Sequence, residues 1–513
     1  MQGLTIGLVT AVLATALTTP ATAAPRATEP DWVNCGVDAQ CAKVSVPLEW
    51  DRPSGAKITL AVDRHKTDPA TRKGVLFLAP GVGFDMVIAG IRQGLLAQMP
   101  EVLRDFDIVG VDPRGGGLHP FNGRLPAPFR SDSIECTERV HDPAVNSFPR
   151  NETEYAELVR HNRAYAASCA NPLLDHMDTT NIARDLDAVR AALGESTVSM
   201  FLYGYGGPLT QTYASLFPQR IRAIAVDSPP DHTVPSAARV AGYALTVERE
   251  FTKFAEWCDR SPWQPTNPAF PGCQLHGQDV GAVYDSVLRQ GDTRPVRLDL
   301  PPEPGRPGPA ETVLVRGNDL AFLTEQLLEI GDMPAPYGLG WSNLSIAISQ
   351  AAQGVSPTFA SVYRYSWGYR DLWNPIRAGG CQDFPAQVKD FADLKARERL
   401  VAALAPHTRG ASQAWDMMTG CIGWPAAGTN PPKPSPAPDA PPILIVGARG
   451  NPWAPYEGLL ATAAQIRRSV VLTYEGDAHI AFLSSPCVVR NIEQYLVTAV
   501  APPAGSSCPA IPT

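Results

Sequence analysis

Short apolar runs that end at a proline recur along the first part of the chain. Two of them cover residues 74–79 and 106–112. Continuous apolar runs of this length are typical of strands that are buried on both faces of a parallel sheet. Ahead of them, residues 42–48 and 57–63 flank a turn-forming segment, which predicts a β-hairpin. We therefore expect a mostly parallel sheet that begins with antiparallel strands.

Strand-like and helix-like patterns then alternate. In residues 181–193 the apolar positions 183, 186, 189 and 193 mark one helix face. Residues 209–217 predict a second helix, because a proline follows directly. The remaining expected elements are strands at 197–202, 221–226, 442–447 and 469–474 and a final helix at about 487–498. Alternation of this kind favours an α/β fold, and the chain length suits one α/β domain with a large insertion.

The alternation stops between residues 229 and 435. This segment is rich in aromatic residues and proline and has a largely helical pattern. An insertion at this point would form a cap over the carboxyl edge of the sheet, where α/β sheets bind ligands. The predicted core is therefore split into residues 25–228 and 436–513. The cap aromatics have two interpretations: they pack the core of the cap, or they form a flat apolar surface for a ligand.

Charge and the chain start narrow the class of protein. The chain of 513 residues has a net charge of -8, which argues against nucleic acid or an acidic membrane surface as partner. Residues 1–24 contain an apolar stretch followed by Ala21-Thr22-Ala23-Ala24, a pattern typical of a secretory signal peptide. No later apolar run reaches the ~20 residues that a membrane span needs. We expect a secreted, extracellular protein without a membrane anchor.

Ten cysteines support export. They follow one another as Cys35 and Cys41, Cys136 and Cys169, Cys258 and Cys273, Cys381 and Cys421, Cys487 and Cys508. Neither CxxC pairs nor histidines at metal-ligand spacing accompany them, so structural disulfides are the better interpretation. Sequence does not fix their connectivity, and we expect each cysteine to pair with its neighbour in this order. No metal and no cofactor is expected.

A glycine stands where a nucleophile is expected. Residues 201–207 read Phe-Leu-Tyr-Gly-Tyr-Gly-Gly between a predicted strand and a predicted helix. In a nucleophile elbow a serine occupies the apex of such a turn, with small residues two places before and after it. Here the apex is Gly204, and the earlier small position is Leu202. The sequence predicts a preserved turn around an altered centre.

Short motifs recur in order over nearly the whole mature chain. They are Val46-Pro47-Leu48 with Asp51-Arg52-Pro53, Phe106-Asp107 with Asp112-Pro113-Arg114-Gly115, Thr179-Thr180 with Asp185-Leu186-Asp187, Leu216-Phe217-Pro218, Cys421 with Trp424-Pro425, Pro455-Tyr456-Glu457-Gly458, and the tail 487–508. In these motifs the chain resembles the secreted tripeptidyl aminopeptidase group of the α/β-hydrolases, which are proline-iminopeptidase-like serine peptidases with a TAP-like C-terminal segment. The resemblance implies an α/β-hydrolase fold: a mostly parallel sheet flanked by helices, with a helical cap insertion. It also implies a peptide or small-molecule ligand.

The resemblance also places the catalytic positions. It puts Gly204 at the nucleophilic serine and Asn451 at the acid, so both positions of the triad are degenerate. The family's oxyanion loop corresponds to a segment that contains Gly81-Val82-Gly83 and keeps only part of the usual glycine run. Among the triad positions, His479 alone has the residue that the family carries.

These replacements argue against ordinary serine hydrolysis as the function. In serine peptidases of other folds, loss of the nucleophile costs about 10⁶ in kcat and an Asp-to-Asn change in the triad about 10⁴. We expect a non-hydrolytic catalyst that performs cyclase- or isomerase-type acid–base chemistry through His479, Asp85 and Tyr205. One alternative is a catalytically dead ligand-binding pseudoenzyme, and another is a serine aminopeptidase with residual activity. In the alternative, non-catalytic interpretations, Asp85 is a solvated loop carboxylate and His479 is a residue without function that is hydrogen-bonded by Asn451.

Overall fold

A computed structural model describes residues 30–36, 38–78, 97–116, 130–169, 171–267, 271–300, 311–328, 340–368 and 373–511. Within these residues the main sheet has ten strands in the order β1-β2-β3-β5-β4-β6-β7-β10-β11-β12. The strands are β1 (Val33–Gly36), β2 (Ala39–Pro47), β3 (Lys57–His65), β4 (Gly74–Leu78), β5 (Phe106–Val111), β6 (Val198–Tyr203), β7 (Ile221–Asp227), β10 (Leu444–Gly450), β11 (Val470–Asp477) and β12 (Ser507–Cys508).

The sheet is parallel except at its N-terminal end. Strands β1, β2 and β3 pair antiparallel, and β3 runs antiparallel to β5. From β5 to β12 every pairing is parallel. The expected hairpin and the expected mostly parallel sheet are both confirmed. Because the strands are parallel, the carboxyl ends of β6, β7, β10 and β11 meet at one edge of the sheet.

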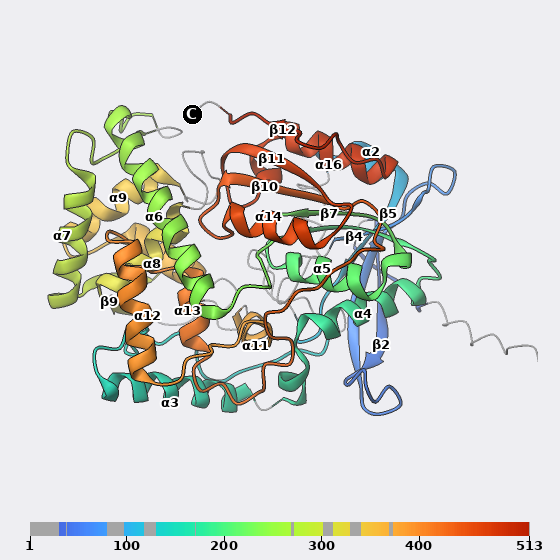
Figure 1. Cartoon of the computed structure of the whole chain (residues 1–513), viewed down its shortest axis with the longest axis horizontal. Helices are drawn as coiled ribbons and strands as arrows, with labels where there is room; N and C mark the ends of the chain where they lie inside the picture. The colour runs from blue at the N-terminus through green and yellow to red at the C-terminus, as the bar shows by residue number, and fades with distance from the viewer. Residues whose placement is uncertain are drawn as a thin grey trace, which may run out of the picture.

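Helices cover both faces of the sheet (Figure 1). One face is covered by α4 (Thr179–Ala192), α5 (Gly206–Leu216) and α14 (Tyr456–Gln465), and the other by α2 (Pro100–Asp105) and α16 (Pro486–Thr498). Strand β6 supplies both cores, because Met200 and Leu202 face the first and Phe201 faces the second. This alternation explains why central strands have no polar face.

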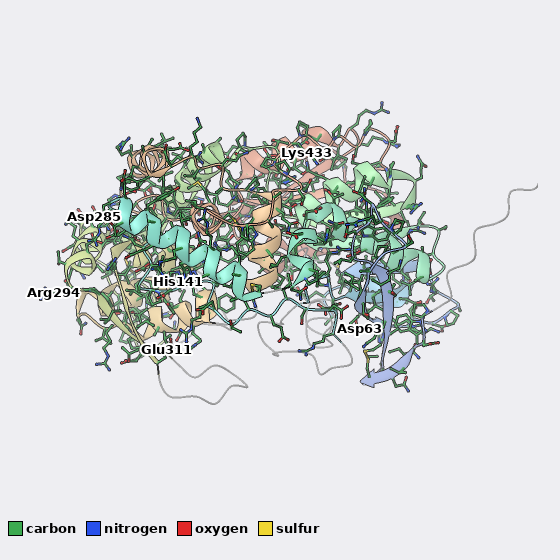
Figure 2. The ribbon with its side chains drawn as sticks, turned by 90° about the horizontal axis from the view of Figure 1, so that it is seen from below. Asp63, His141, Asp285, Arg294, Glu311 and Lys433 are labelled. Carbon is green, nitrogen blue, oxygen red and sulfur yellow. A yellow bond between two sulfur atoms is a disulfide. The ribbon has the colours of Figure 1, made fainter. Side chains whose placement is uncertain are left out.

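The segment between β7 and β10 forms a separate body beside the sheet (Figure 1). Its elements are α6 (Ser236–Arg260), α7 (Val280–Thr293), β8 (Val296–Leu300), β9 (Glu311–Val315), α8 (Gly317–Leu328), α9 (Trp341–Ala352), α10 (Pro357–Tyr363), η3 (Arg364–Gly368), α11 (Trp373–Asp383), α12 (Phe391–Leu404) and α13 (Gln413–Gly420). Helix α3 (Glu152–Cys169) also packs against it. We call the elements from α6 to α13 the cap. Figure 2 shows Asp63 of β3 at one end of the molecule and Arg294 and Glu311 of the cap at the other.

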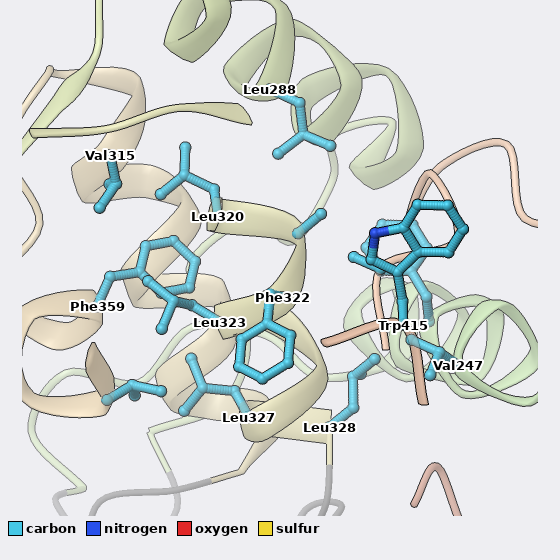
Figure 3. Close-up of a cluster of buried hydrophobic side chains, with 14 of the residues drawn as sticks. Val247, Leu288, Val315, Leu320, Phe322, Leu323, Leu327, Leu328, Phe359 and Trp415 are labelled. Carbon is cyan, nitrogen blue, oxygen red and sulfur yellow. The ribbon is translucent and has the colours of Figure 1, made fainter. Parts of the chain in front are cut away.

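The cap has its own hydrophobic core. Helix α8 is its centre, because Leu320, Leu323 and Leu327 are fully buried and repeat at helical spacing. Figure 3 shows these side chains converging with Phe359 from α10, while Trp415 of α13 lies nearby. Many of the cap aromatics, Trp415 included, therefore pack this core, in line with the first of the two interpretations above.

Five disulfides crosslink the described chain, and each joins neighbouring cysteines as expected: Cys35–Cys41, Cys136–Cys169, Cys258–Cys273, Cys381–Cys421 and Cys487–Cys508. Such a set is typical of proteins that fold in an oxidising compartment. The expected signal peptide lies outside the described residues. Of the helices that the structure describes, none is long and apolar enough to cross a membrane.

Candidate functional site

Strand β6 and helix α5 meet in a sharp turn at Gly204. The residue has a φ of +52°, in the left-handed region, and its N–H donates to Asp227 O at 2.9 Å. Helix α5 begins two residues later and packs tightly, since a Cβ on Gly207 would lie 2.5 Å from Pro229 Cβ. Leu202 does not crowd the turn, because its side chain is buried in the sheet core. The geometry of a nucleophile elbow is present without a nucleophile.

His479 faces the apex of this turn. A Cβ built on Gly204 would lie 3.6 Å from His479 Nε2 and 3.8 Å from Cε1. A hydroxyl on that Cβ could reach Nε2 within hydrogen-bonding distance. The structure therefore brings together the two positions that the resemblance assigned to nucleophile and base, and a Cβ at position 204 would be in ordinary van der Waals contact with the imidazole.

Asn451 is locked beneath His479 by hydrogen bonds. Its Oδ1 accepts from the backbone N–H groups of Trp453 and Ala454 at 3.0 Å each and lies 3.4 Å from His479 Nδ1. Its Nδ2 donates to His479 O at 3.0 Å. Both polar atoms of the amide are thus engaged in hydrogen bonds. Because Oδ1 can only accept, its weak contact with Nδ1 assigns the proton of the neutral ring to Nδ1. The lone pair on Nε2 then faces Gly204.

Desolvation keeps the half-buried imidazole of His479 neutral. The ring packs against Trp453 with 4.8 Å between ring centroids, and desolvation lowers the pKa of His479 to about 3. A carboxylate at position 451 would favour the charged imidazolium, but the amide has no charge to do so. His479 is thus a hydrogen-bond acceptor at neutral pH and a weak base.

We expect the ring signals of His479 in long-range ¹H–¹⁵N NMR spectra to stay unchanged from pH 8 to pH 5. The physical reason is that burial disfavours the charged ring, so protonation begins only near the lowered pKa. The signals are assigned by their loss in the His479→Gln variant. A titration midpoint near ~6.5, the ordinary value for histidine, would contradict a buried neutral ring.

Ser228 is the other hydroxyl beside the turn. It lies directly after β7 with a φ of +58°, and its Oγ contacts both Asp227 Oδ1 at 2.9 Å and the backbone carbonyl of His479. Asp227 is also held by the N–H of Phe482, at 2.7 Å, and burial raises the pKa of its carboxyl to about 7. Ser228 therefore bonds to an acid and a carbonyl, and its Oγ makes no hydrogen bond to the imidazole ring.

Tyr205, a predicted catalytic residue, follows Gly204 and points into a polar cluster. Its hydroxyl donates to Asp383 Oδ2 at 3.0 Å. Asp383 also accepts from Thr179 and Asn430 and is fully buried. Desolvation raises the pKa of Tyr205 well above its usual range, and the Asp383 carboxylate adds to the shift. The ring of Tyr205 lines the site, while its proton is engaged away from His479.

A cavity of about 160 Å³ connects the turn with the cap. Gly204, His479 and Ser228 line its sheet side. Its cap side is largely aromatic, with Tyr243, Phe322, Trp367 and Phe384 among the lining residues. The second interpretation of the cap aromatics, an apolar ligand surface, stays a prediction for this wall. Cavities of this composition, with a few fixed polar groups, are typical ligand sites.

Three residues that line the cavity carry four buried donor atoms without a partner in the described structure. They are Nε and Nη2 of Arg239, Nε2 of Gln326 and Nε1 of Trp453, all on lining residues. The sequence did not single out any of these donors, because an arginine or glutamine on an amphipathic helix has the pattern of a solvated face. No sequence signal separates such a residue from a buried one.

The remaining predicted site residues cannot be placed. Asp85 and the loop residues Gly81, Val82 and Gly83 lie outside the described residues. Within the described ranges, no group of three His, Cys, Asp or Glu side chains is arranged to hold a metal ion.

Comparison with known proteins extends over most of the chain. The family profile described as TAP-like protein matches residues 405–508, and the profile described as alpha/beta hydrolase fold matches residues 94–262. Serine protease Hip1 of Mycobacterium tuberculosis is 28% identical over 489 residues, which are 92% of this chain and 87% of that protein. Tripeptidyl aminopeptidase of Streptomyces lividans is 27% identical over 492 residues, 91% of this chain and 84% of that protein. Carboxylesterase B of Mycobacterium tuberculosis is 27% identical over 495 residues, 92% and 86% of the two chains.

Proposed function

Because the chain belongs to the α/β-hydrolases with a TAP-like C-terminal segment, we propose that it retains their pocket without serine hydrolysis and binds a small organic molecule there. One observation carries this proposal: His479 Nε2 faces the open position above Gly204, at 3.6 Å from where a side chain would begin. A pocket with a base, an elbow and no nucleophile is suited to a non-covalent ligand.

Covalent hydrolysis has no atom to start from at the elbow. Glycine offers no side chain that could form an acyl-enzyme. Ser228 does not replace it, because its Oγ bonds to Asp227 and the carbonyl of His479 rather than to the imidazole. The names serine protease and tripeptidyl aminopeptidase, which two relatives carry, thus describe a step that this chain lacks the residue to perform.

Binding is favoured by the polar groups that the cavity leaves available. Nε2 of His479 is an acceptor, and Arg239, Gln326 and Trp453 offer donors. A buried donor without a partner costs about 1–3 kcal/mol, so a ligand that pairs with these groups recovers that free energy on binding. The aromatic walls add apolar contact area, and a peptide with suitable groups would use the same contacts.

Acid–base catalysis on the bound molecule is a second candidate function, and the tautomer of His479 favours it. With its proton on Nδ1 toward Asn451, the ring presents the lone pair of Nε2 to the cavity, as a general base does. Its low pKa restricts it to protons that the substrate itself makes acidic. Cyclisation, epimerisation and elimination fit this limit when the proton lies beside a strong electron-withdrawing group.

Incubation of the purified protein with a small-molecule extract of a culture of its source organism tests both functions. After separation by filtration, chromatography with mass spectrometry compares the free and the protein-bound compounds for the wild type and His479→Gln. We expect a compound that is retained by the wild type at stoichiometric amounts and at least ~10-fold less by the variant, since the variant loses the imidazole Nε2 as acceptor.

Each outcome separates the candidates. A retained compound of unchanged mass and retention time supports binding. A product of unchanged mass and altered retention time, lost in His479→Gln, supports an isomerising or cyclising catalyst. A product heavier by one water overturns the non-hydrolytic proposal, and retention of nothing by the wild type overturns ligand binding.

We also propose that the protein meets this ligand after export. The five disulfides favour an oxidising compartment, which is consistent with the expected signal peptide at residues 1–24. Detection of the protein in culture medium, with its N-terminus near residue 25, tests this localisation. A cytosolic protein that retains residues 1–24 would contradict it.

A further inference from the structure

Arg239 is a buried arginine that has no ion-pair partner among the residues that the structure describes. It lies in the second turn of α6 with only 8% of its surface exposed, and its guanidinium carbon is 4.3 Å from the centroid of the Phe384 ring. Its Nε and Nη2 have no hydrogen-bond partner, and no described carboxylate forms an ion pair with it. A buried charge without a partner is costly, and proteins normally pair it or hydrogen-bond it.

The same chain satisfies a buried arginine fully where the role is structural. Arg114 is completely buried, and its Nε and Nη2 bind the two oxygens of Asp185 at 2.7 and 2.8 Å. Its remaining N–H groups donate to the backbone carbonyls of Leu48, His176 and Pro47. Arg239 differs from Arg114 in that it lines a cavity and its Nε and Nη2 have no hydrogen-bond partner.

The charges that line the cavity do not cancel. In the part of the lining that the structure describes, there are two arginines, Arg239 and Arg377, and one carboxylate, Asp416. Arg377 Nη2 donates to Asp416 Oδ2 at 2.8 Å, so these two neutralise one another. His479 is neutral, as argued above. Among the described lining residues, one positive charge, on Arg239, is left without a counter-charge.

We propose that Arg239 is the recognition site for the carboxylate of a flat, apolar organic acid that fills the cavity. The free Nε and Nη2 present the two parallel donors that a carboxylate accepts in a bidentate pair. Gln326 and Trp453 add single donors, and the aromatic wall takes the apolar body. This inference rests on the proposed ligand-binding function and names its ligand class.

The assignment also disfavours one class of ligand, those with a free ammonium group. A ligand that enters with a free α-ammonium group would place a cation beside the unpaired Arg239 in a desolvated site. Like charges that share such a site repel strongly. Recognition of a peptide N-terminus at this position is therefore disfavoured, whereas a C-terminal carboxylate or an aromatic acid fits.

Three probes of nearly equal shape test the inference: 2-naphthoate, 2-naphthamide and 2-naphthylmethylammonium. Their dissociation constants are measured by titration calorimetry at fixed ionic strength for the wild type, Arg239→Met and Arg239→Lys. We expect the wild type to bind the acid at least ~10-fold more tightly than the amide and to bind the cation most weakly. In Arg239→Met the acid and the amide should bind equally, while Arg239→Lys should keep part of the preference.

Folding is monitored separately by thermal unfolding without ligand. Because Arg239 is an uncompensated buried charge, Arg239→Met should keep or raise the melting temperature of the free protein, by up to a few degrees. A large fall in that temperature would mean that Arg239 has a structural partner, and it would overturn the assignment.

Equal affinity of the wild type for acid and amide, or a preference that survives in Arg239→Met, would overturn the carboxylate site. Absence of measurable binding of all three probes would overturn the proposed match between cavity and aromatic acid. The extract experiment keeps the two proposals distinct: if every retained compound lacks an acidic group, the carboxylate assignment fails and ligand binding stands.

Discussion

Replacing Gly204 with serine is expected to raise the rate of p-nitrophenyl acetate hydrolysis by about 10²-fold over the wild type. The new Cβ would lie 3.6 Å from His479 Nε2, so the hydroxyl reaches the base, and a left-handed φ is the conformation that this turn already has. Restoring a nucleophile is worth ~10⁶ in other serine peptidases, and an amide in place of the triad acid removes ~10⁴ of that gain. Initial-rate spectrophotometry measures the difference.

Gly204→Ala is the matched control, because it adds the same Cβ without the hydroxyl. A gain in the serine variant that the alanine variant shares would not come from a nucleophile. No gain at all in a folded Gly204→Ser protein would contradict the geometry of the turn and His479.

Adding Asn451→Asp to Gly204→Ser should recover less than the full ~10⁴-fold in rate that an amide in place of the triad acid costs. Asn451 Nδ2 donates to His479 O at 3.0 Å, and a carboxylate oxygen in its place would face that carbonyl with no proton between them. Loss of this donor also weakens the anchoring of His479. The amide is thus integrated into the surrounding structure, so the loss of the triad acid cannot be reversed by one substitution.

The second large effect is expected from Arg114→Met, which should lower the free energy of unfolding by ~3–5 kcal/mol because it leaves a buried carboxylate unpaired. Arg114 and Asp185 are both almost completely buried, and among the described residues the one other side-chain donor to Asp185 is Trp50, at 3.0 Å. The pair joins the strand-end segment after β5 to helix α4. Urea-induced unfolding, monitored by tryptophan fluorescence, measures the change.

Arg184→Met serves as the comparison, since Arg184 lies next to Asp185 on helix α4. Its partner Asp51 is 3.4 Å away and is exposed. Exposed pairs contribute about 0–1 kcal/mol, so this variant should unfold almost as the wild type does. If the two variants were destabilised equally, burial of the Arg114 pair would not be the cause.

Much of the fold follows from the sequence because the sheet is central. Strands such as β4 and β5 are buried on both faces, so their residues are apolar without interruption and easily recognised. The ends of helices were less predictable. Helix α5 begins at Gly206, three residues before the expected start, because its first turn contains glycines and a proline, which the prediction assigned to the preceding turn. The two-stranded sheet β8–β9 in the cap was not predicted. Its buried and exposed positions alternate as in a strand, but the sequence analysis interpreted this segment as largely helical.

Some positions of the candidate site could likewise be predicted from the sequence, and others could not. The positions of Gly204, Asn451 and His479 could be predicted, because an elbow has a local sequence pattern and the resemblance aligns the rest. Arg239 could not, since the lack of a hydrogen-bond partner for its Nε and Nη2 depends on which described side chains surround it in three dimensions. The role of Tyr205 also depends on a distant residue, Asp383, which lies 178 positions further along the chain.

The most direct test of the central claim is the intact mass of the wild-type protein after incubation with a fluorophosphonate. The account predicts no added mass on the wild type and one phosphonyl adduct on Gly204→Ser, located by peptide mapping at position 204. An adduct on the wild type at Ser228, or at any other residue that lines the cavity, would contradict the claim that this pocket has lost its nucleophile.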